Sequence, residues 1–342
     1  MAYSTIIKPN TQMNPVTYTG NGVNPTSITS VGFQPDFLWI KSRSDAFSHL
    51  LFDVVRGVDK RLISNSTAAE STEATISSFD TDGWTMDNDA ANNGSSKTYV
   101  GWNWKAGGTA VSNTDGDIAS QVSANTTAGF SIVNYTGNGT GSSTVGHGLG
   151  VAPAFVIIKN ISSVDAWIVF PTGATRLVLN SNASDYGNNG ITKGANTITL
   201  PSGVDNAWNT NGQNYVMYTF AEKKGFSKFG SYVGNGNADG TFIYTGFKPA
   251  YFVIKRTDAT ENWYCTDIKR NPINPVDNEL LLLNSDTATI TTSYPVDFLS
   301  NGFKIRGNNN ITNASGATYI YMAFAENPLV ANTSGGIPTT AR

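Results

Sequence analysis

The sequence contains the same series of short motifs three times, and this repetition limits what the chain can fold into. The series opens with YTGNG at residues 18–22 and 135–139 and with YVGNG at residues 232–236. A proline-led apolar segment follows each opening, then a leucine-rich segment that ends in Asn-Ser, and an aromatic segment closes each series. The closing segments read TYVGWNWK, NYVMYTFAE and TYIYMAFAE. Several motifs in one fixed order predict a threefold internal repeat.

The proline-led segments GFQPDFLWIK, GVAPAFVIIK and GFKPAYFVIK are typical of β-strands, because β-branched and aromatic residues dominate them. In the first segment Phe37 and Trp39 lie on one face of the expected strand, and Leu38 and Ile40 lie on the other. A strand that is apolar on both faces has to be covered on both faces. We expect one cover to be an opposing sheet. The other is a loop, a neighbouring repeat or another subunit.

Asn-Gly turns and short alternating segments predict about six to eight strands in each repeat. The expected fold class is therefore all-β, with three tandem antiparallel repeats that resemble β-sandwiches or jelly rolls. The repeats can follow one another like beads or close around a pseudo-threefold axis, and the sequence leaves both arrangements open.

The motif positions also predict the boundaries along the chain. We expect an extended N-terminal arm, a linker between the first two repeats with one short strand near residues 118–122, and an irregular C-terminal tail. The predicted segments are the arm 1–16, repeat one 17–105, the linker 106–129, repeat two 130–224, repeat three 225–326 and the tail 327–342.

Composition argues against several kinds of partner. The 342 residues carry 22 Lys and Arg against 25 Asp and Glu, a formal net charge of −3, without a dense basic run. Nucleic acid and anionic membranes attract clustered Lys and Arg, so we expect neither as a partner, and no apolar run is long enough to span a membrane. The only cysteine, Cys265, excludes an intrachain disulfide framework. The first residues lack a secretory signal pattern, so we expect synthesis in the cytoplasm.

The sequence offers little chemistry, and we predict no enzyme, no cofactor and no metal site. The two histidines, His49 and His147, lie in unrelated contexts and are expected to be structural. Carboxylates crowd the first repeat in turn-forming contexts, so a polysaccharide depolymerase acting through Asp80 or Asp82 is the least favoured function. The strings DTDG and NTDGD supply oxygen ligands but do not complete a calcium-binding loop.

Aromatic side chains are the remaining route to ligand binding. Trp167 and Trp263 follow the closing lysines of the second and third proline-led segments at the same distance, and His49 holds the corresponding place in the first repeat. Exposed tryptophans would suit sugar rings, which makes these two the candidate ligand-binding residues. The alternative, which we favour, is a core aromatic on a repeated strand, since large aromatics are usually buried.

The chain resembles a family of structural repeats found in bacteriophage virions. The resemblance lies in the order of the motifs YTGNG, GFQPDFLWIK, HLLFDVVRG, SNSTAAESTEA, SSFDTDGW and YVGWNWKAGG, and it extends through VGHGLGVAPAFVIIKN to the closing GIPTTAR. It covers nearly the whole chain, although the second repeat departs most. The resemblance implies a virion protein of a tail fibre or of a capsid fibre or decoration, and it implies no catalytic residues.

These inferences lead to a ranked expectation of function. The first is a non-enzymatic virion structural protein that assembles through its repeats and extended tails with other copies of itself, as a homotrimer, and with other virion proteins. The second is an adhesin on the same virion that attaches to host-surface glycan. The depolymerase comes third.

Overall fold

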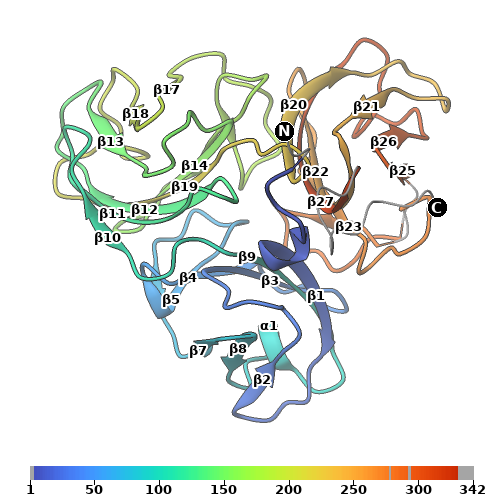
Figure 1. Ribbon diagram of the computed structural model, residues 1–342, viewed down its shortest axis with the longest axis horizontal. Coiled ribbons are helices and arrows are strands. Elements are labelled where there is room, and N and C mark those ends of the chain that lie inside the picture. The colour runs from blue at the N-terminus through green and yellow to red at the C-terminus, as the bar shows by residue number, and fades with distance from the viewer. Residues whose placement is uncertain (1–3, 277–278, 292–293, 330–342) are drawn as a thin grey trace.

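The computed structural model describes residues 4–276, 279–291 and 294–329, and these residues form an all-β protein. The strands form three groups arranged around a common centre (Figure 1). Each group contains one large antiparallel sheet and one three-stranded sheet. The expected all-β class of antiparallel sheets is therefore confirmed.

The first group contains β1 to β9 and a single helical turn. Its large sheet has the order β1-β9-β3-β4-β5-β6, and its small sheet has the order β2-β8-β7. The elements are β1 Met13–Thr19, β2 Thr26–Ile28, β3 Phe37–Ser42, β4 Leu50–Asp53, β5 Gly57–Leu62, β6 Ser71–Thr72, β7 Ile76–Asp80, β8 Gly83–Met86, α1 Ala90–Asn93 and β9 Thr98–Trp104, with a 3₁₀ turn at Pro9–Thr11 before them.

The second group contains β10 to β19. The large sheet has the order β10-β11-β12-β19-β14-β15-β16, and the small one has the order β13-β18-β17. The strands are β10 Val111–Asn113, β11 Ser120–Asn125, β12 Phe130–Thr136, β13 Thr144–Gly146, β14 Phe155–Asn160, β15 Trp167–Phe170, β16 Leu177–Val178, β17 Thr192–Lys193, β18 Thr197–Thr199 and β19 Asn214–Phe220.

The third group contains β20 to β27. Its sheets have the orders β20-β27-β22-β23-β24 and β21-β26-β25. The strands are β20 Ser227–Val233, β21 Phe242–Tyr244, β22 Phe247–Arg256, β23 Tyr264–Asp267, β24 Leu281–Leu282, β25 Val296–Leu299, β26 Gly302–Ile305 and β27 Thr318–Pro328.

The three large sheets share one strand order at their centres. The strand that ends in the Tyr-Thr/Val-Gly-Asn-Gly motif pairs with the aromatic closing strand, and the closing strand pairs in turn with the proline-led strand. The two motif tyrosines face one another in each pairing, and their rings stack 5.0–5.1 Å apart. The paired tyrosines are Tyr18 with Tyr99, Tyr135 with Tyr215, and Tyr232 with Tyr319.

A buried asparagine holds each YTGNG-type turn. In the first group Asn93 accepts hydrogen bonds from the backbone N–H groups of Asn21 and Gly22, through its side chain at 3.0 Å and its carbonyl at 2.9 Å. Asn209 and Asn313 make the same pair of contacts in the other groups. The second glycine of each motif has φ between +66° and +71°, which the missing Cβ permits. The motif recurs because the same turn is built three times.

The arrangement of the core explains why the proline-led strands are apolar on both faces. One face of each large sheet packs on its own small sheet, and the opposite faces of all three meet in a single central cluster. Three aromatic rings at matching positions of the closing strands, Trp104, Phe220 and Phe324, lie 5.9–6.4 Å apart at this centre. The cavity beside them measures only about 20 Å³ and is lined by apolar side chains.

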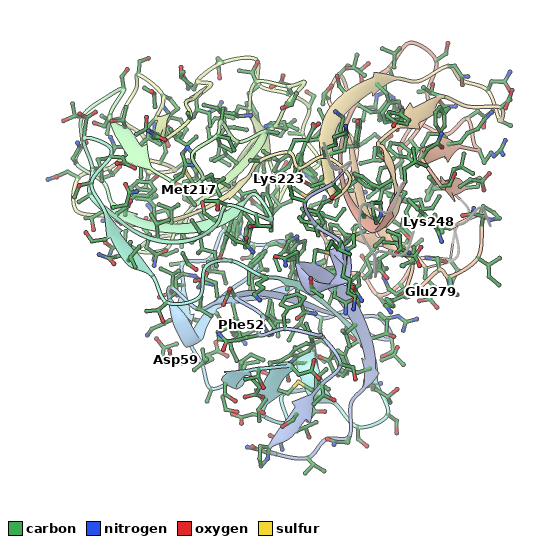
Figure 2. The ribbon with its side chains drawn as sticks, viewed as in Figure 1. Phe52, Asp59, Met217, Lys223, Lys248 and Glu279 are labelled. Atoms are coloured by element: carbon green, nitrogen blue, oxygen red, sulfur yellow. The ribbon has the colours of Figure 1, made fainter. Side chains whose placement is uncertain are left out.

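Side chains fill the space between the three groups (Figure 2). The second cover of each two-faced strand is thus the neighbouring group of the same chain, and these faces do not need another subunit. This removes the packing argument for a homotrimer and leaves only the argument from resemblance.

Two connecting segments also differ from expectation. The segment expected to be a linker, 106–129, contains two strands that extend the second large sheet. Of these, β11 overlaps the short strand expected near residues 118–122, whereas β10 was not expected. In the expected N-terminal arm, Ile6 and Met13 are buried in the central cluster, so these residues anchor the arm on its own chain. The expected C-terminal tail lies mostly outside the described residues, and β27 ends at Pro328.

Candidate functional site

The two candidate tryptophans lie at the seams where one strand group meets the next. Trp167 donates a hydrogen bond from Nε1 to the carbonyl of Ile63 in the first group, at 2.9 Å. Trp263 donates in the same way to Val178 in the second group, also at 2.9 Å. Both side chains are fully buried. Neither ring has a face open to solvent, so neither can stack on a sugar, and the structural interpretation of these residues is the one that fits.

His49 completes this set at the third seam. Its Nε2 lies 3.0 Å from the carbonyl of Leu282 in the third group, and its Nδ1 accepts a hydrogen bond from Trp39 Nε1 at 2.8 Å. With Nδ1 as acceptor, Nε2 carries the proton and donates to Leu282. Burial lowers the pKa of His49 well below its usual value, so the ring is neutral. The histidine therefore has the structural role that the sequence predicts.

A buried lysine lies near the end of each proline-led strand, and two of the three lysines donate a hydrogen bond across a seam. Lys159 donates from Nζ to the carbonyl of Thr67 in the first group, and Lys255 donates to that of Asn182 in the second, each at 3.3 Å. Lys41 holds the corresponding position in the first group. Burial lowers the pKa of each of the three lysines to about 8. Their charge therefore varies near neutral pH, although each ammonium contacts backbone carbonyls rather than a ligand.

Two buried ion pairs at the seams were not anticipated from the sequence. Asp53 pairs with Arg56 at 2.5 Å, and Asp267 pairs with Arg270 at 2.6 Å, with all four side chains at most 1% exposed. Each aspartate also accepts a hydrogen bond from the adjacent group. Asp53 accepts from the Tyr218 hydroxyl at 2.7 Å, and Asp267 accepts from Trp102 Nε1 at 2.9 Å.

The seam between the second and third groups has apolar residues in place of this polar arrangement. The second group has Pro171 and Ala174 where the others have Asp and Arg, and the third group has Met322 where the others have Tyr218 or Trp102. All three positions that form the polar arrangement at the other two seams are therefore replaced together at this seam. A single exchange would leave a buried charge without its partner, which is costly. The repeated D-x-x-R spacing in LFDVVR and CTDIKR is the sequence signal that could have revealed these pairs.

The remaining candidate groups have structural roles. Asp80 accepts hydrogen bonds from Ser78 and Thr85, and Asp82 accepts from the backbone of Ser30 and Gly32, which lowers the pKa of Asp82. His147 is buried, and Cys265 is a free, buried thiol whose pKa burial raises to about 12.

Metal-binding clusters and membrane-spanning helices are both absent from the described residues. No group of three or more His, Cys, Asp or Glu side chains in the described part of the chain could hold a metal ion. None of the helices in residues 4–276, 279–291 and 294–329 is long and apolar enough to cross a membrane.

Sequence comparison assigns a family to this architecture. The family model described as Domain of unknown function (DUF7483) matches residues 8–328. The chain belongs to the DUF7483 family. The match runs from the 3₁₀ turn at the start of the chain to the last residue of β27, so the DUF7483 model covers all three strand groups together with their seams. No curated protein matches the chain significantly.

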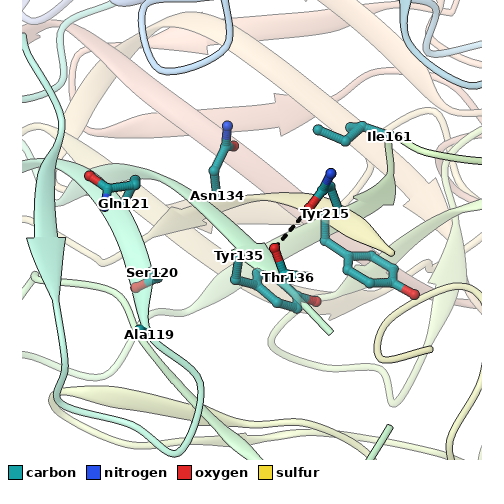
Figure 3. A pocket seen from close by; sticks show the side chains of 9 residues that line it. Ala119, Ser120, Gln121, Asn134, Tyr135, Thr136, Ile161 and Tyr215 are labelled. Carbon is teal, nitrogen blue, oxygen red and sulfur yellow. Dashed lines mark hydrogen bonds between the residues drawn. The ribbon is translucent and has the colours of Figure 1, made fainter. Parts of the chain in front are cut away.

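One open hollow in this DUF7483 protein is built by the second group (Figure 3). It has a volume of about 390 Å³ and lies on β11, β12 and β19. Its lining contains no charged side chain and is formed by Ala119, Ser120, Gln121, Asn134, Tyr135, Thr136, Ile161, Asn214 and Tyr215. The sequence did not reveal this hollow. Its amide residues alternate with other residues along separate strands, and one of these strands, β11, lies in the segment expected to be a linker.

Proposed function

We propose that this protein is a non-enzymatic structural component of a bacteriophage virion, in a tail fibre or in a capsid fibre or decoration. The resemblance in motif order supplies the virion setting. The observation that supports a building role most directly is the set of seam contacts, in which buried tryptophan, histidine, lysine and ion-pair groups connect each strand group to its neighbours. These side chains are of types that act in catalysis or ligand binding in other proteins, and here they stabilise the contacts between the strand groups.

The seams make the body self-contained, which suits a rigid part of a particle. Backbone hydrogen bonds recur at equivalent places: Glu70 donates to Ile161, Asp185 to Thr257 and Thr289 to Arg43, at 2.8–3.1 Å. The three groups share one core, so the body resists separation into single repeats. Contacts with other virion proteins would use the outer surface, since the N-terminal arm is anchored to the central cluster at Ile6 and Met13.

The virion location is tested on particles. Virions produced from the genome that encodes this chain would be purified on a density gradient and analysed by quantitative mass spectrometry. We expect the chain in fixed stoichiometry with the major particle proteins. Recovery of the chain only from the soluble fraction of the lysate would contradict the proposal.

The homotrimer is a separate part of the proposal and needs a separate measurement. Light scattering coupled to size exclusion would give three times 36.4 kDa for the trimer implied by the resemblance. A mass of 36.4 kDa across the concentration range would show that the body stands alone and would leave the structural role to be decided by the particle analysis.

A further inference from the structure

We propose that the hollow on β11, β12 and β19 binds a neutral saccharide. The first support is the register of the three strands. Gln121 faces Asn134 across β11 and β12, and Thr136 faces Asn214 across β12 and β19. Residues two apart on a strand share a face, so Asn134 and Thr136 project to the same side of the sheet. Their polar groups therefore converge over one patch of the sheet.

The hydrogen-bonding capacity of this patch is incompletely used. Thr136 Oγ1 donates to Asn214 Oδ1 at 2.8 Å, the bond dashed in Figure 3, and this leaves Asn214 Nδ2 as a donor. The Oδ1 of Asn134 is buried, and no described residue donates a hydrogen bond to it. A buried acceptor without a donor is costly, so rotation of the Asn134 amide toward the hollow, where a ligand hydroxyl would donate to Oδ1, relieves that cost.

The chemistry of the lining selects the class of ligand. Each amide offers both a donor and an acceptor, as does each sugar hydroxyl, whereas the absence of charged side chains gives no counter-charge to an ionic ligand. The partly exposed Ile161 adds an apolar surface for the C–H face of a sugar ring. A volume of about 390 Å³ is at the small end for ligand pockets, which suits one or two sugar units.

The hollow belongs to the second group alone. The register equivalents of Asn134 are Thr17 and Ser231, and those of Asn214 are Thr98 and Thr318. Among the described residues, the first and third groups also lack a counterpart of β11, which supplies one wall. The three amide side chains and the additional strand β11 therefore occur together in one of three otherwise matching strand groups. A purely structural role of the sheet does not require this combination.

The test is an NMR titration of the full chain with glucose, galactose, N-acetylglucosamine and the β1,4-linked dimers of these sugars, each to about 20 mM, because a shallow site of this kind binds in the millimolar range. We expect saturable shifts of the side-chain amide signals of Gln121, Asn134 and Asn214 with at least one sugar. Asn134→Thr and Asn214→Thr, which install the residues that the first group has at these positions, should each weaken binding about 3- to 10-fold.

Two controls show whether the amides of this hollow recognise the sugar itself. Asn196→Ala, in the exposed turn between β17 and β18, should leave the titration unchanged, and circular dichroism should show all variants folded. Acetamide tests whether the amides recognise peptide groups instead. No saturable shift with any sugar, or equal saturation by acetamide, would overturn the proposal. The result is independent of the particle analysis, so either proposal can fail without the other.

Discussion

The seam between the first and second groups allows a quantitative test of how the strand groups are held together. Arg56 is 1% exposed and donates to Asp53 at 2.5 Å, to Glu70 at 3.0 Å and to the carbonyl of Lys60 at 2.9 Å. Arg56→Met removes these contacts and leaves the carboxylate of Asp53 buried without its cation. We expect the free energy of unfolding to fall by about 3–5 kcal/mol.

A second variant isolates the charge from the packing. Asp53→Asn/Arg56→Met removes both charges of the buried pair. The asparagine Oδ1 can still accept from the backbone N–H groups of residues 55 and 56, which lie 3.0 and 2.9 Å from Asp53 Oδ1 in the unsubstituted chain. We therefore expect the double variant to recover about 1–3 kcal/mol relative to the single one. The apolar set with Pro171 and Ala174 at the corresponding seam indicates that the fold tolerates an uncharged arrangement there.

The assay is urea unfolding followed by tryptophan fluorescence and far-ultraviolet circular dichroism, with coincident transitions as the requirement for a two-state treatment. Arg306→Met is the matched control, because Arg306 is 41% exposed in its ion pair and should contribute less than about 1 kcal/mol. An Arg56→Met variant as stable as this control, or a double variant no more stable than the single one, would refute the reasoning.

Three further predictions concern the same architecture. The three buried lysines near the ends of the proline-led strands have a pKa of about 8 in the folded chain and 10.5 when exposed. The unfolded chain therefore binds more protons between these values, and each lysine should raise the free energy of unfolding by about 1–3 kcal/mol as pH rises from 8 to 10. Replacing all three by methionine should reduce this rise in urea unfolding, and the remaining part belongs to Lys193, whose pKa burial also lowers to about 8. Trp263→Phe removes the bond to Val178 and should cost about 1–3 kcal/mol by the same assay, whereas unchanged stability would contradict a seam role. Asn209→Ala removes the buried amide from the second YTGNG turn and should cost about 1–3 kcal/mol, while Asn211→Ala, at an exposed position nearby, should be neutral in thermal melts.

Much of the local structure could be predicted from the sequence. Strand residues such as Phe37 to Ile40 carry apolar groups on both faces, and that pattern depends only on chain geometry. The Asn-Gly turns follow from backbone conformations that few residues adopt cheaply. Equal spacing also identified His49, Trp167 and Trp263 as counterparts, and the structure places all three at equivalent hydrogen bonds.

The candidate sites were less predictable, because they depend on which strands become neighbours. The amides of the hollow come from β11, β12 and β19, and β19 is separated from the other two by most of the second group. The strand β11 overlaps the short strand expected near residues 118–122, but the sequence of the expected linker gave no sign of which sheet it would join. Sequence spacing alone cannot show that Gln121, Asn134 and Asn214 share one surface.

The sequence by itself determined the strands, the turns and the need to cover each proline-led strand twice, because these follow from side-chain polarity and backbone sterics within a few residues. Only the tertiary structure decided what provides the second cover. The three groups close on one another and bury Trp104, Phe220 and Phe324 at a common centre, since the shared core removes apolar surface from water without another chain. The same closure buries the tryptophans that could have faced a ligand and leaves the amides of the second group at the surface.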